Sequence, residues 1–265
     1  MIFLRSLAFA IAFYGWTAIL SLGCIWVLFL PRAVLVRVIT WYLDTVTFLE
    51  RTLLGLTYEV RGLEHRPQGA YIVAAKHQSA WETMKLHRLF GDPAVVLKRE
   101  LTRIPLWCYY ATKAEMIAID RDGMTKAMVA LIADARRAAA AGRPIVIFPQ
   151  GTRTAPGSTA PYHGGVGLLY TSLGLPILPV ALNAGMFWPR RRFIKRPGTI
   201  TVELLPLIMP GLTRKQVMAE LEDRLEAATD RLVTAVGGPA ARPDKVATAP
   251  RSAADAHGEN TPACG

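Results

Sequence analysis

A histidine and a glutamate lie five residues apart in the segment KHQSAWE (76–82), directly after the apolar run YIVAA (71–75). Five residues along one straight helix place two side chains about 140° apart, so such a helix cannot bring them together. They can meet if His77 lies in a turn and Glu82 lies in the first turn of the following helix. The carboxylate would then fix the imidazole tautomer and leave the other ring nitrogen as a general base. Spacing alone more often produces a loop histidine beside an unrelated glutamate, so the pairing is a hypothesis.

A second polar segment, FPQGTRT (148–154), follows the apolar run PIVIF (144–148). Gly151 allows the backbone to approach a ligand closely, and Thr152 offers a hydroxyl group. Arg153 can bind a phosphate through two parallel hydrogen bonds. The segment lacks the Gly-Lys-Ser/Thr ending of a nucleotide-binding P-loop, so it predicts a phosphate site of another kind. The alternative is an ordinary glycine-containing turn with one solvated arginine.

These two segments need a scaffold that brings strand ends together. Short apolar runs predict strands that are covered on both faces, at 71–75, 94–98, 115–119, 144–148, 177–182 and 199–204. The alanine-rich segment 125–141 predicts a helix that ends at Gly142, and a capping box at Thr213 predicts another helix up to about residue 235. This alternation predicts an α/β fold with a mainly parallel central sheet flanked by helices. In such sheets reactive groups gather where strands end and helices begin.

The N-terminal part of the chain is strongly apolar. Residues 6–30 contain no charged side chain and predict a transmembrane helix roughly 37 Å long, enough to cross a hydrocarbon core of ~30 Å. A cleaved signal peptide is the rival interpretation, but the run is long and no small-residue cleavage site closes it. Residues 33–55 predict a second apolar helix, either at the membrane interface or packed on the soluble domain. Positive charges flank both sides of the first helix, so charge alone does not give its orientation.

The composition fits a membrane anchor attached to a globular domain. The chain has 265 residues, 52% of them hydrophobic, with a mean hydropathy of +0.26 and a formal net charge of +11. This composition excludes wholesale disorder. Three widely spaced cysteines predict neither a disulfide framework nor a metal motif. We therefore divide the chain into an N-terminal membrane anchor (1–55), an α/β domain (56–236) and a disordered tail (237–265).

A basic segment, RRRFIKR (190–196), contributes to the positive charge. It predicts an interfacial patch that contacts anionic lipid headgroups, where each basic residue contributes ~1 kcal/mol. The alternative is a solvated charged loop. No recognised nucleic-acid motif accompanies the segment, so we expect no nucleic-acid partner.

Five segments, in one order along residues 57–205, resemble motifs of the glycerophospholipid acyltransferase family, most closely those of the bacterial 1-acyl-sn-glycerol-3-phosphate acyltransferases. They are His77…Glu82, Lys98-Arg99-Glu100-Leu101 with Ile104-Pro105, Ile117 to Arg121, Phe148 to Thr154, and Pro176 to Val180. An N-terminal hydrophobic element is also usual in that family. Five segments in one order are far more specific than any one of them.

Three positions depart from the family pattern. Glu82 stands where most members have Asp, as in the lipid A secondary acyltransferases, and its longer side chain keeps the carboxylate. Gln150 stands where the family has Glu, which removes a negative charge but keeps a hydrogen-bonding group. His163 stands where a lysine is common. The first two changes leave the base and Arg153 in place, and the second puts the substrate's identity in doubt more than the reaction type.

The resemblance implies a reaction. His77 would take the proton from the free hydroxyl of 1-acyl-sn-glycerol-3-phosphate while Glu82 holds the imidazole, and the hydroxyl would attack the thioester of acyl-CoA or acyl-ACP to give phosphatidic acid. Backbone N–H groups near Gly151 or Ser79 could stabilise the oxyanion. The residues expected to bind the substrate are Lys98, Arg121, Gly151, Thr152 and Arg153.

The resemblance also sets expectations for partners and location. We expect no cofactor and no metal, membrane lipids and the acyl donor as partners, and a place at the bacterial inner membrane with the catalytic domain facing the cytoplasm. Two alternatives stay open. The chain could acylate another lysolipid, such as lyso-ornithine lipid, or it could be a catalytically silent lipid-binding relative.

Overall fold

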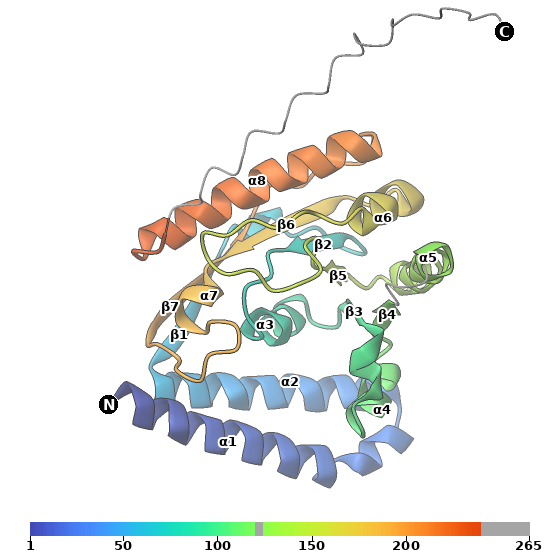
Figure 1. Cartoon of the computed structure of the whole chain (residues 1–265). Coiled ribbons are helices and arrows are strands. Elements are labelled where there is room, and N and C mark those ends of the chain that lie inside the picture. The colour runs from blue at the N-terminus through green and yellow to red at the C-terminus, as the bar shows by residue number, and fades with distance from the viewer. Residues whose placement is uncertain (120–123, 240–265) are drawn as a thin grey trace, which may run out of the picture.

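The computed structural model describes residues 1–119 and 124–239 (Figure 1). Arg121 and residues 240–265 of the predicted tail lie outside the described residues. The predicted α/β domain is built around one sheet of seven strands in the order β1-β7-β6-β2-β5-β3-β4. The strands are β1 (Leu56–Arg61), β2 (Ile72–Ala75), β3 (Ala94–Lys98), β4 (Ile117–Ile119), β5 (Ile145–Ile147), β6 (Ile177–Leu182) and β7 (Gly198–Leu204).

The sheet is mainly parallel, which confirms the prediction for its central strands. Strand β2 pairs in parallel with both β5 and β6, and β3 pairs in parallel with β5 and β4. Strand β7 runs antiparallel to β6, and the edge strand β1 pairs with β7 in parallel, so β7 and β1 run opposite to the other five strands. All six predicted strands are present, and β1 is a seventh strand that the sequence analysis missed.

Helices cover both faces of the sheet, as Figure 1 shows. Helix α3 (Trp81–Phe90) lies on one face, while α5 (Met124–Ala140), α6 (Gly165–Leu173) and α8 (Arg214–Ala235) lie on the other. The side chains of β2 alternate between the two cores, with Val73 facing α3 and Ile72 facing the opposite layer. The remaining helices of this domain are α4 (Trp107–Lys113) and α7 (Ala184–Phe187), with short helical turns at Leu63–His65 and Arg99–Arg103.

The capping box predicted at the start of α8 is present. The Thr213 side chain accepts a hydrogen bond from the Gln216 backbone, and the Gln216 side chain accepts one from the Thr213 N–H group. Helix α8 therefore begins where the sequence predicts, and it ends at Ala235 as expected.

The N-terminal apolar part forms two antiparallel helices side by side below the sheet in Figure 1. Helix α1 (Ile2–Gly23) is followed by a 3₁₀ turn (Ile25–Phe29), and α2 (Arg32–Leu49) leads into a π-helical turn (Glu50–Leu54). The predicted single helix over 6–30 is wrong in its boundaries, because it begins earlier and stops at Gly23. Within the described part of the chain, α1 is the one helix long and apolar enough to cross a membrane.

Hydrogen bonds join the two helices and fix both ends of α1 to the α/β domain. The Trp16 indole donates to the Thr45 hydroxyl at 2.8 Å, which links α1 to α2. At the N-terminal end, the Lys195 N–H donates to the Ser6 hydroxyl at 3.0 Å, and the Arg5 guanidinium donates to the Leu53 carbonyl of the π-helical turn at 2.8 Å. At the other end, the Tyr110 hydroxyl of α4 donates to the Ser21 carbonyl at 2.7 Å.

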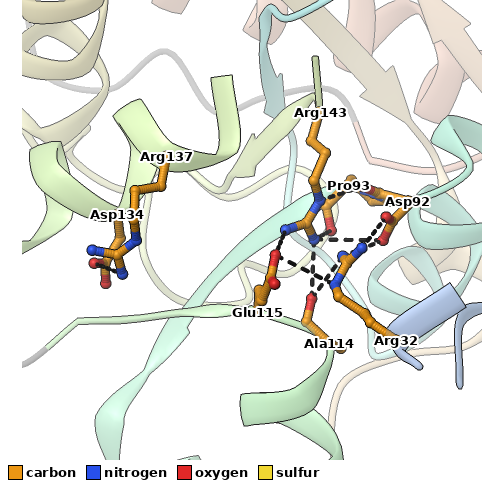
Figure 2. Close-up of polar contacts among 8 residues, drawn as sticks. All are labelled: Arg32, Asp92, Pro93, Ala114, Glu115, Asp134, Arg137 and Arg143. Atoms are coloured by element: carbon orange, nitrogen blue, oxygen red, sulfur yellow. Dashed lines mark hydrogen bonds and ion pairs between the residues drawn. The ribbon is translucent and has the colours of Figure 1, made fainter. Parts of the chain in front are cut away.

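An ion-pair cluster fixes the start of α2 (Figure 2). Arg32 holds the Asp92 carboxylate with two hydrogen bonds of 2.6 and 2.7 Å. Arg143, which is nearly buried, donates to Glu115 at 2.8 Å and to the Ala114 carbonyl at 3.0 Å. Asp92 precedes strand β3, Arg143 precedes strand β5, and Glu115 follows α4. The cluster therefore binds α2 to the amino-terminal edge of the sheet. Residues 33–55 also contact the α/β domain directly, since Glu50 pairs with Lys85 of α3, and their place at a membrane interface stays a prediction.

Candidate active site

The imidazole of His77 and the carboxylate of Glu82 meet as the sequence predicts. His77 lies in the turn after β2, and Glu82 lies in the first turn of α3. The distance between His77 Nδ1 and Glu82 Oε1 is 2.8 Å. A turn followed by the start of a helix brings two side chains five residues apart into contact, which a continuous helix could not do.

Glu82 is held as a fully buried acceptor at the start of α3. Its Oε1 atom also accepts the backbone N–H groups of Gln78 at 2.7 Å and Ser79 at 2.6 Å. The side chain is 0% exposed. Two backbone N–H groups donate to this oxygen, so Oε1 acts as the acceptor of the contact with His77 as well. The hydrogen of that contact then lies on His77 Nδ1, and Nε2 is left as the acceptor of a proton from a substrate.

The His77 ring is reachable by a substrate. Its side chain is 15% exposed. Its face stacks on the Phe148 ring with the centroids 4.1 Å apart. The Ser79 hydroxyl accepts the Trp81 N–H at 3.1 Å, so Ser79 helps to start the helix that carries Glu82. The arrangement can supply a general base with a fixed tautomer and an oriented ring.

A buried ion pair connects α3 to the N-terminal helices. The Lys85 ammonium lies 2.8 Å from Glu50 Oε2 and donates to the Thr47 hydroxyl at 2.5 Å. The Trp81 indole N–H donates to the same Glu50 oxygen at 3.3 Å. Burial raises the pKa of Glu50 and lowers the pKa of Lys85, because each charged form loses water. The helix that carries Glu82 is thus positioned by groups from the apolar N-terminal part.

The predicted phosphate segment lies beside the histidine. Gly151 has a φ of +60°, a left-handed conformation that suits glycine, and it sits in the turn after β5. The Thr154 N–H donates to the His77 carbonyl at 2.8 Å, which joins the two loops. Thr152 is exposed and Arg153 is half-buried. No hydrogen bond or ion pair joins the Arg153 guanidinium to another described residue, so this cation can bind an anion.

Lys98 ends strand β3 and is exposed. Because β2, β5 and β3 are parallel neighbours, Lys98 lies at the same edge of the sheet as His77 and Arg153. Arg121 lies outside the described residues, and its expected role in binding the substrate stays a prediction.

The two N–H groups considered for an oxyanion are both engaged. The Ser79 N–H donates to Glu82 at 2.6 Å, and the Gly151 N–H donates to the Phe148 carbonyl at 2.9 Å. An oxyanion site at other N–H groups near Gly151 or Ser79 stays a prediction.

Several residues around the site were missed by the sequence analysis. Lys76 pairs with Glu226 of α8 at 2.5 Å, and the Tyr162 hydroxyl donates to the same carboxylate at 2.7 Å. Arg190 donates to the Arg153 carbonyl at 2.6 Å, so the basic segment contacts the predicted phosphate segment 148–154, called the phosphate loop below. No spacing signal could reveal these contacts, since the partners lie far apart along the chain.

The described residues contain no group of three or more His, Cys, Asp or Glu side chains placed to hold a metal ion. The expected independence from metal and cofactor stays a prediction.

Comparisons with known proteins place the chain in a family. Residues 57–183 match the family model described as Acyltransferase. A 1-acyl-sn-glycerol-3-phosphate acyltransferase from Pseudomonas aeruginosa is 38% identical over 180 residues, which cover 68% of this chain and 70% of that protein. The chain belongs to the acyltransferase family.

More distant relatives agree with this assignment. The 1-acyl-sn-glycerol-3-phosphate acyltransferase alpha of Mus musculus is 30% identical over 176 residues, which cover 63% of this chain and 60% of the mouse protein. The crystal structure of the 1-acyl-sn-glycerophosphate (LPA) acyltransferase from Thermotoga maritima matches with a TM-score of 0.73 at 20% identity. This match covers 88% of this chain and 98% of the other, and it confirms the fold.

Proposed function

We propose that this chain transfers an acyl group from acyl-CoA or acyl-ACP to the free hydroxyl of 1-acyl-sn-glycerol-3-phosphate, which gives phosphatidic acid. The observation that carries the proposal is the 2.8 Å contact between His77 and the fully buried Glu82, at the sheet edge where Arg153 offers an unpaired cation. The names of the relatives from Pseudomonas and mouse support the same substrate.

The reaction needs a base and a way to hold the acceptor. His77 Nε2 takes the proton of the lysolipid hydroxyl as its oxygen attacks the thioester carbonyl, and Glu82 stabilises the imidazolium that forms. The tetrahedral intermediate then expels the thiolate of the donor, and the proton on Nε2 passes to that sulfur. The donor is already activated, so no protein nucleophile and no resident cofactor are required.

Binding of the acceptor phosphate falls to the cations at the sheet edge. Arg153 and Lys98 hold the phosphate in this proposal, with Arg121 as a third cation and Gly151 and Thr152 giving the phosphate loop its shape. Holding the acceptor in place contributes a large share of the rate enhancement, because it converts a bimolecular encounter into a reaction within one complex.

We also propose that α1 and the basic segment 190–196 bind the chain to the membrane surface. Several large apolar side chains of α1 are exposed, among them Phe3, Leu4 and Ile11. The Phe3 ring lies 5.5 Å from the ring of Phe193, so the apolar side of α1 continues into the basic segment. Because both ends of α1 contact the α/β domain, α1 lies along the lipid surface in this proposal instead of crossing the membrane as the sequence predicts. The proposal also includes a catalytic domain on the cytoplasmic side of the bacterial inner membrane, where the acyl donors are present.

Binding to vesicles tests the membrane proposal. Charge reversal of two exposed arginines (R191E/R192E) is expected to weaken binding to vesicles that contain phosphatidylglycerol, and added salt should weaken binding of the unchanged protein. The matched control is Lys215→Glu on α8, which lies on the other side of the sheet from α1 (Figure 1). Equal binding by R191E/R192E and the unchanged protein would contradict the role of the basic segment.

One assay tests the enzymatic proposal. The detergent-purified chain is incubated with acyl-CoA or acyl-ACP and with lysophosphatidic acid or lyso-ornithine lipid, and the products are identified by mass spectrometry. Phosphatidic acid is the expected product, and His77→Ala should abolish its formation while the thermal unfolding temperature stays within a few degrees. Turnover by His77→Ala would overturn the mechanism. Product from the lyso-ornithine lipid alone, or no product at all, would overturn the substrate or the enzymatic function.

A further inference from the structure

A buried polar cluster lies directly behind the two loops of the active site. The Lys76 ammonium donates to both carboxylate oxygens of Glu226, at 2.5 and 2.6 Å. The same Oε1 atom of Glu226 accepts the Tyr162 hydroxyl at 2.7 Å and the Gln150 amide at 3.4 Å. Side chains from three other parts of the chain therefore contact this one carboxylate of α8.

The burial of Lys76 makes this carboxylate necessary. The Lys76 side chain is 2% exposed, and Glu226 is 21% exposed. A buried ammonium without an opposite charge loses its hydration and gains nothing in return. Burial and the nearby Glu226 charge raise the pKa of the Tyr162 hydroxyl, which therefore stays neutral and acts as a donor. The cluster thus holds one positive and one negative charge.

Gln150 connects this charge pair to the catalytic histidine. Its amide Nε2 donates to Glu226, while its Oε1 accepts the Thr154 hydroxyl at 3.2 Å. The Thr154 N–H in turn donates to the His77 carbonyl at 2.8 Å. The amide at position 150 both donates and accepts, which the ionised carboxylate of a glutamate could not do because it has no hydrogen to give.

A carboxylate at position 150 would conflict with Glu226. It would place a second negative charge about as close to Glu226 Oε1 as the Gln150 amide is now, with only Lys76 to balance both. The glutamine that departs from the family pattern is thus matched to a glutamate on α8, 76 residues away.

We infer that Glu226 and Gln150 act together as positioning residues, and that α8 supplies the single carboxylate that holds Lys76, the phosphate loop and the His77 loop in register. The inference rests on the proposed function, because it assigns the phosphate loop to the acceptor. Neither residue touches the reacting atoms. Their effect passes through Lys76 to the histidine loop and through Gly151 to Arg153.

A charge-exchange cycle tests the inference with Gln150→Glu, Glu226→Gln and the double variant Q150E/E226Q. Each single change upsets the charge balance, and each is expected to lower kcat/KM for lysophosphatidic acid by about 10- to 100-fold, as misplacement of reacting groups does. The double variant restores one negative charge and is expected to return to within about threefold of the unchanged protein. Asp223→Asn, at an exposed position of α8, makes the same change from carboxylate to amide outside the cluster, so it is the matched control and should keep full activity.

The kinetic constants separate positioning from general loss of structure. Because the phosphate loop is displaced in the single variants, KM for lysophosphatidic acid should rise while KM for the acyl donor stays constant. Thermal unfolding of all four proteins reports the charge balance independently of activity, and the double variant should recover most of the Tm lost by Glu226→Gln.

The outcomes distinguish failure of the proposed function from failure of the positioning role of Gln150 and Glu226. If the unchanged protein forms no phosphatidic acid, the proposed function fails. Recovery of Tm in the double variant then still supports the pairing of positions 150 and 226 through one negative charge. If the unchanged protein is active and the double variant is no better than the worse single variant, the inference is overturned. Equal increases in both KM values would also overturn the positioning role.

Discussion

Two neighbouring residues, Lys76 and His77, each find a carboxylate partner, but the partners come from very different places. Glu82 lies five residues after His77 and is fully buried, whereas Glu226 lies 150 residues after Lys76 and is 21% exposed. Successive side chains of β2 alternate between the two faces of the sheet, and Lys76 and His77 continue this alternation toward α8 and α3. Adjacent positions therefore depend on opposite layers of the molecule.

A sequence can suggest an ion pair between residues close along the chain, but not one between residues far apart. The local pair follows from a turn and a helix start within seven residues, so spacing suggests it. The distant pair exists only because α8 packs on the face of the sheet opposite α3 (Figure 1). We expect the local pair to control chemistry and the distant pair to control position and stability, and the following predictions test that division.

Removal of the Glu82 charge should have the largest effect. Glu82→Gln is expected to lower kcat by about 10³-fold, because a neutral amide cannot stabilise the imidazolium and offers hydrogens to the N–H groups of Gln78 and Ser79. Steady-state kinetics with lysophosphatidic acid measure the loss. Glu82→Asp, which keeps the charge on a shorter side chain, is the matched variant and should retain more activity. If kcat of Glu82→Gln were within tenfold of the kcat of the unchanged protein, the His77–Glu82 pair would have no major role in catalysis.

Removal of Lys76 should mainly cost stability. Lys76→Met leaves Glu226 without its partner, and we expect a loss of about 3 kcal/mol in the free energy of unfolding, as for other broken buried pairs. The double variant Lys76→Met/Glu226→Leu removes both charges and should recover most of that loss. Urea unfolding in detergent measures both values. Equal destabilisation of the single and double variants would show that packing, and not charge, is what Lys76 provides.

A histidine without a carboxylate partner sharpens the contrast with His77. His87 of α3 is 4% exposed, and neither ring nitrogen has a hydrogen-bond partner among the described residues. Burial lowers its pKa from 6.5 to about 4. Between pH 6.5 and pH 4, the unfolded chain binds a proton at His87 and the folded chain does not. The free energy of unfolding therefore falls as the pH falls through this range.

The pH dependence of unfolding measures this effect. His87 alone should cost about 2 kcal/mol of the free energy of unfolding between pH 7.5 and pH 5. His87→Phe should lack this part of the loss, while His65→Phe, at a partly exposed position, should behave as the unchanged protein does. The same loss in His87→Phe would show that His87 is not the responsible group.

The smallest effects come from removing single hydroxyl groups, one in the distant cluster and one on α4. Tyr162→Phe removes the 2.7 Å hydrogen bond to Glu226, and we expect a loss of about 1.5 kcal/mol because the acceptor is charged. Tyr110→Phe removes a 2.7 Å hydrogen bond to the neutral Ser21 carbonyl and should cost less, about 1 kcal/mol. A reversed order of the two losses would argue against a charged Glu226 in the cluster.

Much of the fold could be predicted from the sequence, and the errors have physical causes. The six predicted strands are mostly apolar runs, and β2, β5 and β6 are fully buried, so these runs stand out from their surroundings. Strand β1 was missed because the prediction relied on continuous apolar runs, whereas LTYEVR alternates apolar and polar residues as a half-buried strand does. The helix predicted over 6–30 was too long because an uninterrupted apolar run contains no signal for its end. The end comes from α4, where Tyr110 and Lys113 bind the carbonyl groups of Ser21 and Leu28.

From the sequence by itself, the strand ends and a possible meeting of His77 with Glu82 could be predicted, because a turn and a helix start act over a few residues. The expected roles of these two residues and of Arg153 came from the resemblance to the family motifs, since spacing alone more often produces a loop histidine beside an unrelated glutamate. Only the tertiary structure decided what surrounds them. The partner of Lys76, the role of Gln150 and the contact of Arg190 with the Arg153 carbonyl join segments that are 37 to 150 residues apart. Spacing carries no information about such contacts, since they depend on how the helices pack on the two faces of the sheet.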